Sequence, residues 1–121
     1  MAIDIANSLP KTLPITVEQY RLLVDHGEFQ DHPGQVELIY GKIVETNPQG
    51  PQHADPIDEL EAWSHREAGS LFRIRVEKPI EIAGLNSSPE PDIAWVKLQR
   101  YAQQHPRPSD VSLLMEVSVS S

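Results

Sequence analysis

Two carboxylates in this sequence are placed where they could bind a metal ion. Asp92 follows Pro91 and opens a short apolar segment, and Glu116 lies inside the apolar run 113–117. A carboxylate in such a run is costly to bury alone, so an arginine, a bound proton or a metal ion must compensate it. If the two segments are adjacent strands, about 4.8 Å apart, both carboxylates could bind one divalent ion.

A divalent ion at this place would polarise a phosphate group and lower the pKa of a bound water. An Asp followed by Glu-x-Lys on a neighbouring strand is the pattern of metal-dependent nucleases, in which the lysine adds positive charge. Here Ser118 stands where that lysine would be, which departs from the pattern. Two structural interpretations therefore stay open: Asp92 binds turn amides at a strand start, and Glu116 pairs with an arginine in the core.

Two helices are predicted from their capping residues. The segment 16–19 (T-V-E-Q) has the form of a capping box, which predicts a helix over residues 17–25 that Gly27 ends. Further along, Asp55-Pro56 is typical of an N-cap followed by the first helical residue, and it predicts a helix that ends near Gly69. Both helices carry an apolar stripe that can pack on a sheet.

Short apolar runs between glycines and prolines predict the strands. They cover residues 35–40 and 42–46, which form a tight hairpin at Gly41, and residues 71–76, 79–82, 92–96 and 111–117. The last run is the most strand-like, so we expect it to be central and buried on both faces. Residues 97–104 are expected to form one or two helical turns. The order of elements predicts an α/β or α+β domain.

Composition limits the kinds of protein this chain can be. Its 121 residues fit one domain, and 10 Lys+Arg against 18 Asp+Glu give a net charge of −8. That charge excludes a generic basic coat for nucleic acid or membrane, and it leaves a carboxylate metal site open. The chain has no cysteine, so it has no disulfide or thiolate metal site. Without an apolar run of about 18 residues or a secretory signal, no membrane contact and a cytoplasmic location are expected.

The charge is distributed unevenly along the chain. Residues 1–60 hold 3 basic and 10 acidic side chains, whereas residues 61–121 hold 7 basic and 8 acidic ones. Any attraction for a polyanion must therefore come from basic residues of the second half, for example Arg73, Arg75, Lys78, Arg100 and Arg107. Arg73 and Arg75 share one strand face, where contact with phosphate and pairing with local acids both stay open.

Six segments, in the same order along the chain, resemble the motifs of one known family. The segments are 16–20 (T-V-E-Q-Y, similar to T-x-E-E-Y), 37–45 (E-L-I-Y-G-K-I-V-E, similar to E-L-I-D-G-E-I-V-E), 51–54 (P-Q-H-A, similar to P-x-H-x), 79–82 (P-I-E-I, similar to P-I-R-L), 89–94 (P-E-P-D-I-A, similar to E-P-x-P-D-I-A) and 113–121 (L-L-M-E-V-S-V-S-S, similar to L-L-I-E-V-x-x-S-S). Together they span residues 16–121, and through them the chain resembles the putative restriction endonuclease family of the PD-(D/E)XK nuclease superfamily.

The resemblance implies a restriction-endonuclease-like core, with a mixed central sheet flanked by helices. It implies an endonuclease that hydrolyses phosphodiester bonds of nucleic acid, with DNA the expected substrate and Mg²⁺ or Mn²⁺ the cofactor. In that reading Asp92 and Glu116 bind the metal, and Glu37 is a third carboxylate at the metal. His53 orients a phosphate or a water. The alternatives are a solvent-facing hairpin acid for Glu37 and a polar loop residue for His53.

The family continues after the last of these motifs with a helix that carries a lysine and a final pair of strands. We therefore expect a tail over residues 1–14 and a single domain over 15–121 that lacks this C-terminal part, with activity in doubt for want of the lysine. A sheet left open in this way predicts a homodimer. The alternatives are a non-catalytic nuclease-fold module for binding or oligomerisation, and a small metal-binding protein outside phosphodiester chemistry.

Overall fold

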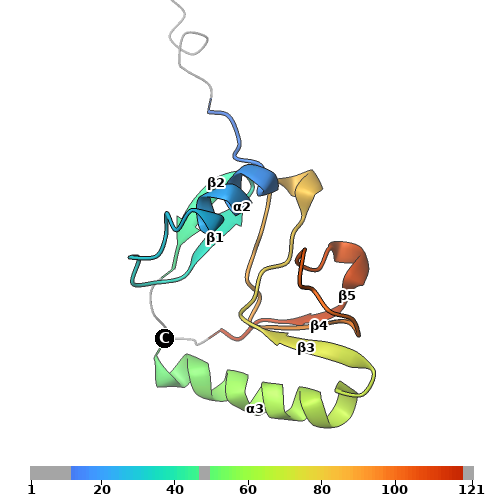
Figure 1. Ribbon diagram of the computed structural model, residues 1–121. Coiled ribbons are helices and arrows are strands. Elements are labelled where there is room, and N and C mark those ends of the chain that lie inside the picture. Colours follow the sequence, from blue (N-terminus) through green and yellow to red (C-terminus); the bar gives the residue numbers. More distant parts are fainter. Residues whose placement is uncertain (1–11, 47–49, 119–121) are drawn as a thin grey trace, which may run out of the picture.

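The computed structural model describes residues 12–46 and 50–118, which form an α+β structure (Figure 1). Its elements are, in chain order, helix α2 (Val17–Asp25), strands β1 (Val36–Ile39) and β2 (Lys42–Glu45), helix α3 (Pro51–Ala68), strand β3 (Phe72–Val76), the 3-10 helix η1 (Ala83–Leu85), strand β4 (Ile93–Lys97), the 3-10 helix η2 (Pro108–Asp110) and strand β5 (Val111–Met115). The expected fold class is confirmed. The strands form two antiparallel sheets, β1-β2 and β3-β4-β5, instead of one mixed sheet.

The described residues bear only in part on two predictions, the N-terminal tail and the cytoplasmic location. The predicted tail 1–14 lies outside the described residues except for 12–14, which are exposed. Within the described ranges, neither α2 nor α3 is long and apolar enough to cross a membrane. The cytoplasmic location stays a prediction.

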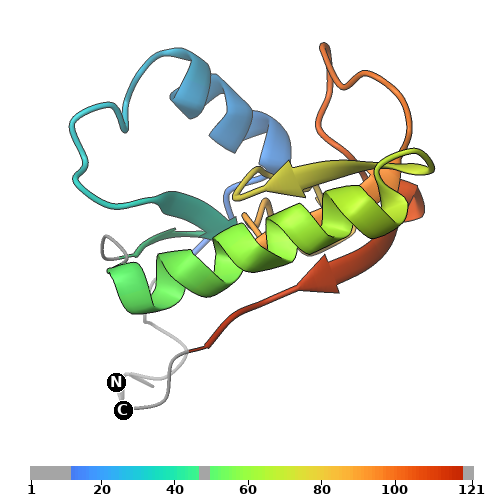
Figure 2. The ribbon, with the colours of Figure 1, turned by 90° about the horizontal axis from the view of Figure 1, so that it is seen from below.

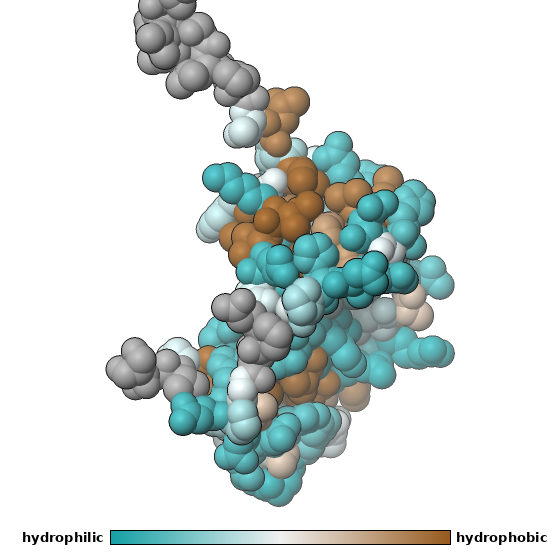
Figure 3. Space-filling model, turned by 90° about the vertical axis from the view of Figure 1, so that its left-hand side faces the viewer, coloured by the Kyte–Doolittle hydropathy of each residue, from teal (hydrophilic) through white to brown (hydrophobic). Residues whose placement is uncertain are grey.

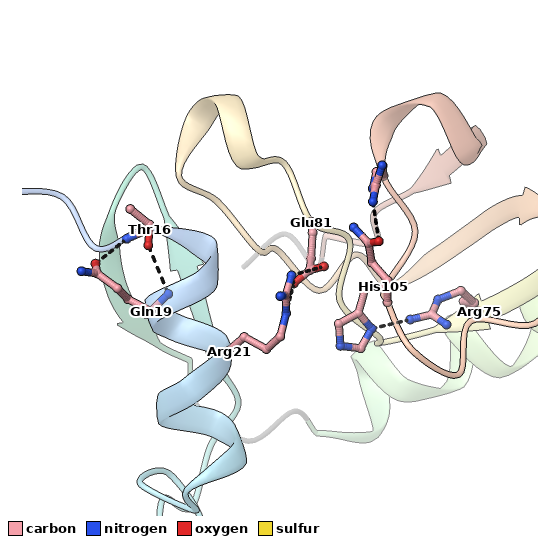
Figure 4. Close-up of polar contacts among 8 residues, drawn as sticks. Thr16, Gln19, Arg21, Arg75, Glu81 and His105 are labelled. Carbon is pink, nitrogen blue, oxygen red and sulfur yellow. Dashed lines mark hydrogen bonds and ion pairs between the residues drawn. The ribbon is translucent and has the colours of Figure 1, made fainter.

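Helix α2 begins at the capping box that its sequence predicts. The Thr16 hydroxyl accepts the Gln19 N–H at 3.1 Å, and the Gln19 side chain accepts the Thr16 N–H at 3.0 Å (Figure 4). The helix packs Val17 and Tyr20 against Leu38 of β1, whose side chain is fully buried. These contacts hold β1 against α2 in one small hydrophobic cluster.

The β1–β2 hairpin is confirmed within one residue at each end. Its two-residue turn has positive φ at Tyr40 (46°) and Gly41 (77°), as a type I′ turn requires. β2 is exposed along its whole length, so the hairpin packs through β1 alone. Figure 3 accordingly shows apolar surface over the part of the molecule that holds α2 and this hairpin. An isolated bridge from Leu38 to Ser88 ties β1 to the segment that leads into β4.

Helix α3 begins five residues earlier than the sequence predicted. The N-cap is Gly50 and the first helical residue is Pro51, and Pro56 lies inside the helix. Proline lacks only the N–H that a first turn leaves unused, so Pro51 is an equally good start, and Asp55 is not the cap. The helix lies across one face of the β3-β4-β5 sheet (Figure 2). The earlier start places His53 in its first turn.

Three further predictions about the second half are wrong. Residues 79–82 are not a strand, because only Ile82 forms a bridge, to Ser87. Residues 97–104 are not helical, because Lys97 ends β4 and residues 98–104 form bends and irregular backbone. Within the described residues β5 is an edge strand, with Leu113 and Leu114 38% and 51% exposed, so it is neither central nor buried on both faces. Apolar composition alone does not distinguish an edge strand from a central one.

Candidate functional site

The antiparallel register of β4 and β5 brings Asp92 and Glu116 together. Ile93 pairs with Met115, so the residue before β4 and the residue after β5 lie at the same end of two neighbouring strands. The pKa of Glu116 is raised, first by partial burial and next by the negative charge of the nearby Asp92 carboxylate. Like charges held this close favour a proton or a cation between them.

Asp92 is buried and its two oxygens are both engaged. One carboxylate oxygen (Oδ2) accepts the backbone N–H of Val117 at 2.7 Å, and the other (Oδ1) lies 3.3 Å from Nε2 of His53. The first contact fits the interpretation that Asp92 binds a backbone amide. Each carboxylate oxygen has two lone pairs, so both retain capacity for a further ligand. Helix α3 and the end of β5 therefore hold the carboxylate in one orientation.

Glu116 is not the buried carboxylate that its apolar neighbours suggested. β5 ends at Met115, so Glu116 lies just beyond the strand, and it is exposed to solvent. No ion pair between Glu116 and an arginine occurs in the described part of the chain. Glu116 borders an apolar hollow of about 280 Å³ whose walls include Ile80 and Leu114. It is thus accessible both to water and to a ligand.

Glu37 comes to the same region from β1. One of its carboxylate oxygens accepts the backbone N–H of Glu90 at 2.5 Å, two residues before Asp92. Its negative charge contributes to raising the pKa of Glu116. Burial, followed by the charges of Glu37 and Glu77, raises the pKa of Glu90 to about 7. Glu90 was not predicted as a site residue. Its position between two prolines, two residues before Asp92, could have suggested it.

These residues have the right chemistry for a hard divalent cation, but they do not form a complete cage. In residues 12–46 and 50–118, no three His, Asp or Glu side chains are grouped closely enough to hold a metal ion. Mg²⁺ commonly binds through one or two carboxylates, with waters and substrate phosphates as the other ligands. Asp92 and Glu116 supply two such carboxylates, and their mutual repulsion would be relieved by a cation. The donor set therefore fits Mg²⁺ or Mn²⁺.

The fold and this acidic site can be compared with known proteins. The family model Uma2, described as a putative restriction endonuclease, matches residues 17–121. The match covers α2, both sheets and all four candidate residues, Glu37, His53, Asp92 and Glu116. No curated protein and no solved structure matches the chain.

Proposed function

Because the chain belongs to the Uma2 putative restriction endonuclease family, we propose that it is an endonuclease that hydrolyses phosphodiester bonds with a divalent cation, Mg²⁺ or Mn²⁺. We propose DNA as its substrate. The observation that supports this most is the placement of Asp92 and Glu116 at the same end of adjacent strands. A pair of carboxylates so placed can hold one ion beside a bound phosphate.

Each residue of the site has a proposed role. Asp92 and Glu116 bind the cation, which when bound neutralises charge on the phosphate and acidifies a water. His53 is a positioning residue, because its Nε2 lies 3.3 Å from Asp92 and its ring keeps that carboxylate in place. Glu37 holds the segment before β4 through the Glu90 amide and adds negative charge near the ion.

Isothermal titration of Mg²⁺ and Mn²⁺ tests this site directly. We expect one ion per chain for the wild type and loss of binding in Asp92→Asn and in Glu116→Gln, because each replaces a charged ligand with a neutral isostere. Glu59→Gln is the matched control, since it removes one exposed carboxylate of α3 outside the site. Equal binding by the wild type and both site variants would contradict the metal assignment.

A second candidate function, a module for self-association, is favoured by β5. Within the described residues β5 pairs with β4 on one side only, and both Leu113 and Leu114 are exposed. An edge strand of this kind offers unpaired backbone N–H and C=O groups to a second chain. We therefore propose a homodimer in which the β5 edges of two copies pair.

Size-exclusion chromatography with light scattering tests the dimer. The wild type is expected at twice the chain mass, and Leu114→Lys is expected to be monomeric because charge is unfavourable in a paired apolar edge. Leu71→Lys, which is exposed outside β5, should remain dimeric. A monomeric wild type at high concentration would exclude the dimer. A dimer without metal binding would favour the non-catalytic module over the endonuclease.

A further inference from the structure

A basic pocket lies beside β3, away from the acidic site. Its volume is about 230 Å³, and the residues with polar side chains that line it are Arg73, Arg75, Lys78, Arg100 and Tyr101. In a chain with a net charge of −8 and 10 Lys+Arg, four cations thus surround one hollow. None of the four takes part in an ion pair within the described ranges. Their charges are therefore not neutralised by the protein itself.

Arg75 is the buried member of this group, with a relative exposure of 9%. Its Nη2 donates to the carbonyl of Pro79 at 3.1 Å and lies 3.2 Å from Nδ1 of His105 (Figure 4). Its guanidinium also lies 5.6 Å from the centre of the Tyr101 ring. Its Nε has no hydrogen-bond partner. A buried charge with an unused donor is unfavourable unless a ligand supplies the missing acceptor.

The partners of these arginines orient them without neutralising them. Arg73 donates to the carbonyl of Gln99 at 2.9 Å, so both strand arginines bind neutral acceptors. Burial lowers the pKa of His105, and Arg75 and Arg21 also lower it, against the opposite influence of Glu81 and Asp25. The neutral ring that results can accept the Arg75 N–H. Of the two interpretations left open by the sequence, pairing of Arg73 and Arg75 with local acids is therefore wrong.

The pocket and the acidic site are connected by the sheet. Arg75 pairs with Ala94 and Arg73 with Val96, and paired residues point to the same face. Ala94 is two residues from Asp92, which is about 7 Å along a strand. The two places thus belong to one sheet, and a polyanion longer than a single phosphate is needed to contact both.

We propose that this pocket binds a phosphate group of the same nucleic-acid backbone that the acidic site contacts. The inference rests on the proposed endonuclease function. Arginine and lysine are the usual donors to phosphate oxygens, and three arginines and one lysine line this hollow. The contact is to the backbone, so it adds affinity and register without reading sequence.

The test measures binding of a short labelled DNA oligonucleotide by fluorescence anisotropy, in EDTA and over a series of salt concentrations. Arg100→Gln and Lys78→Gln change exposed residues and leave Arg75 in place. Each is expected to weaken binding about tenfold and to lower the slope of log K against log salt by about one. Arg66→Gln removes the same charge from α3, outside the pocket, and is expected to change binding by less than about twofold.

A second measurement follows the Arg75 Nε–H signal by NMR while inorganic phosphate is added to the wild type. A shift of that signal, with little effect on the side chain of Arg66, is expected. If Arg100→Gln and Lys78→Gln bind the oligonucleotide as tightly as Arg66→Gln, the proposed phosphate pocket is wrong. The proposed endonuclease function is unaffected by that result. A shift with phosphate together with no oligonucleotide binding would overturn the nucleic-acid assignment and, with it, the proposed function.

Discussion

Asp92→Asn is expected to reduce metal-dependent cleavage of nucleic acid by about 10³-fold or more. Asparagine keeps the shape of the side chain, and its amide oxygen can still accept the Val117 N–H that Asp92 accepts at 2.7 Å. What it loses is the negative charge at a buried position beside Glu116. The measurement is the initial rate of cleavage of labelled DNA and RNA with Mg²⁺ and with Mn²⁺.

Two controls make this result specific. Glu116→Gln should lower the rate in the same direction, and Glu59→Gln should leave it unchanged, since Glu59 lies on the exposed face of α3. Thermal unfolding of all three variants checks that they remain folded. A cleavage rate for Asp92→Asn equal to that of the wild type would refute the assignment of Asp92 to the reaction.

Arg21→Ala is expected to lower the free energy of unfolding by about 2–3 kcal/mol. Arg21 of α2 binds both carboxylate oxygens of Glu81, at 2.8 to 3.1 Å, and Glu81 is only 5% exposed (Figure 4). Breaking a buried pair costs about 3–5 kcal/mol because one charge stays buried alone. The value expected here is smaller because the Arg21 side chain is 43% exposed and is screened by water.

Urea denaturation at neutral pH measures this effect. Arg66→Ala is the matched control on the exposed face of α3, where a change within about 0.5 kcal/mol is expected. The double variant Arg21→Ala/Glu81→Gln should recover part of the loss, because it no longer leaves a carboxylate without its partner. If Arg21→Ala were as stable as Arg66→Ala, the ion pair would not hold α2 against the segment 79–82.

Local sequence patterns predicted the elements that depend on neighbouring residues. The capping box at 16–19 and the turn at Gly41 each act within a few residues, and both were placed correctly. The start of α3 was misplaced because Pro51 and Pro56 are both compatible with a first helical turn. The prediction of a strand over 79–82 was wrong because its apolar residues pack against β4 as an irregular segment, without a ladder of backbone hydrogen bonds to a neighbouring strand.

The sequence by itself determined which side chains are available and where the short-range elements lie: the carboxylates Asp92 and Glu116, the hairpin, the two helices and the excess of acid. Only the tertiary structure decided that β4 and β5 are neighbours, that Glu116 lies beyond an exposed edge strand, and that Glu37 reaches the Glu90 amide. It also decided that four cations share a pocket. The reason is physical: burial, pairing and pKa depend on residues distant in the chain, and their distances are set only when the sheets and helices pack together.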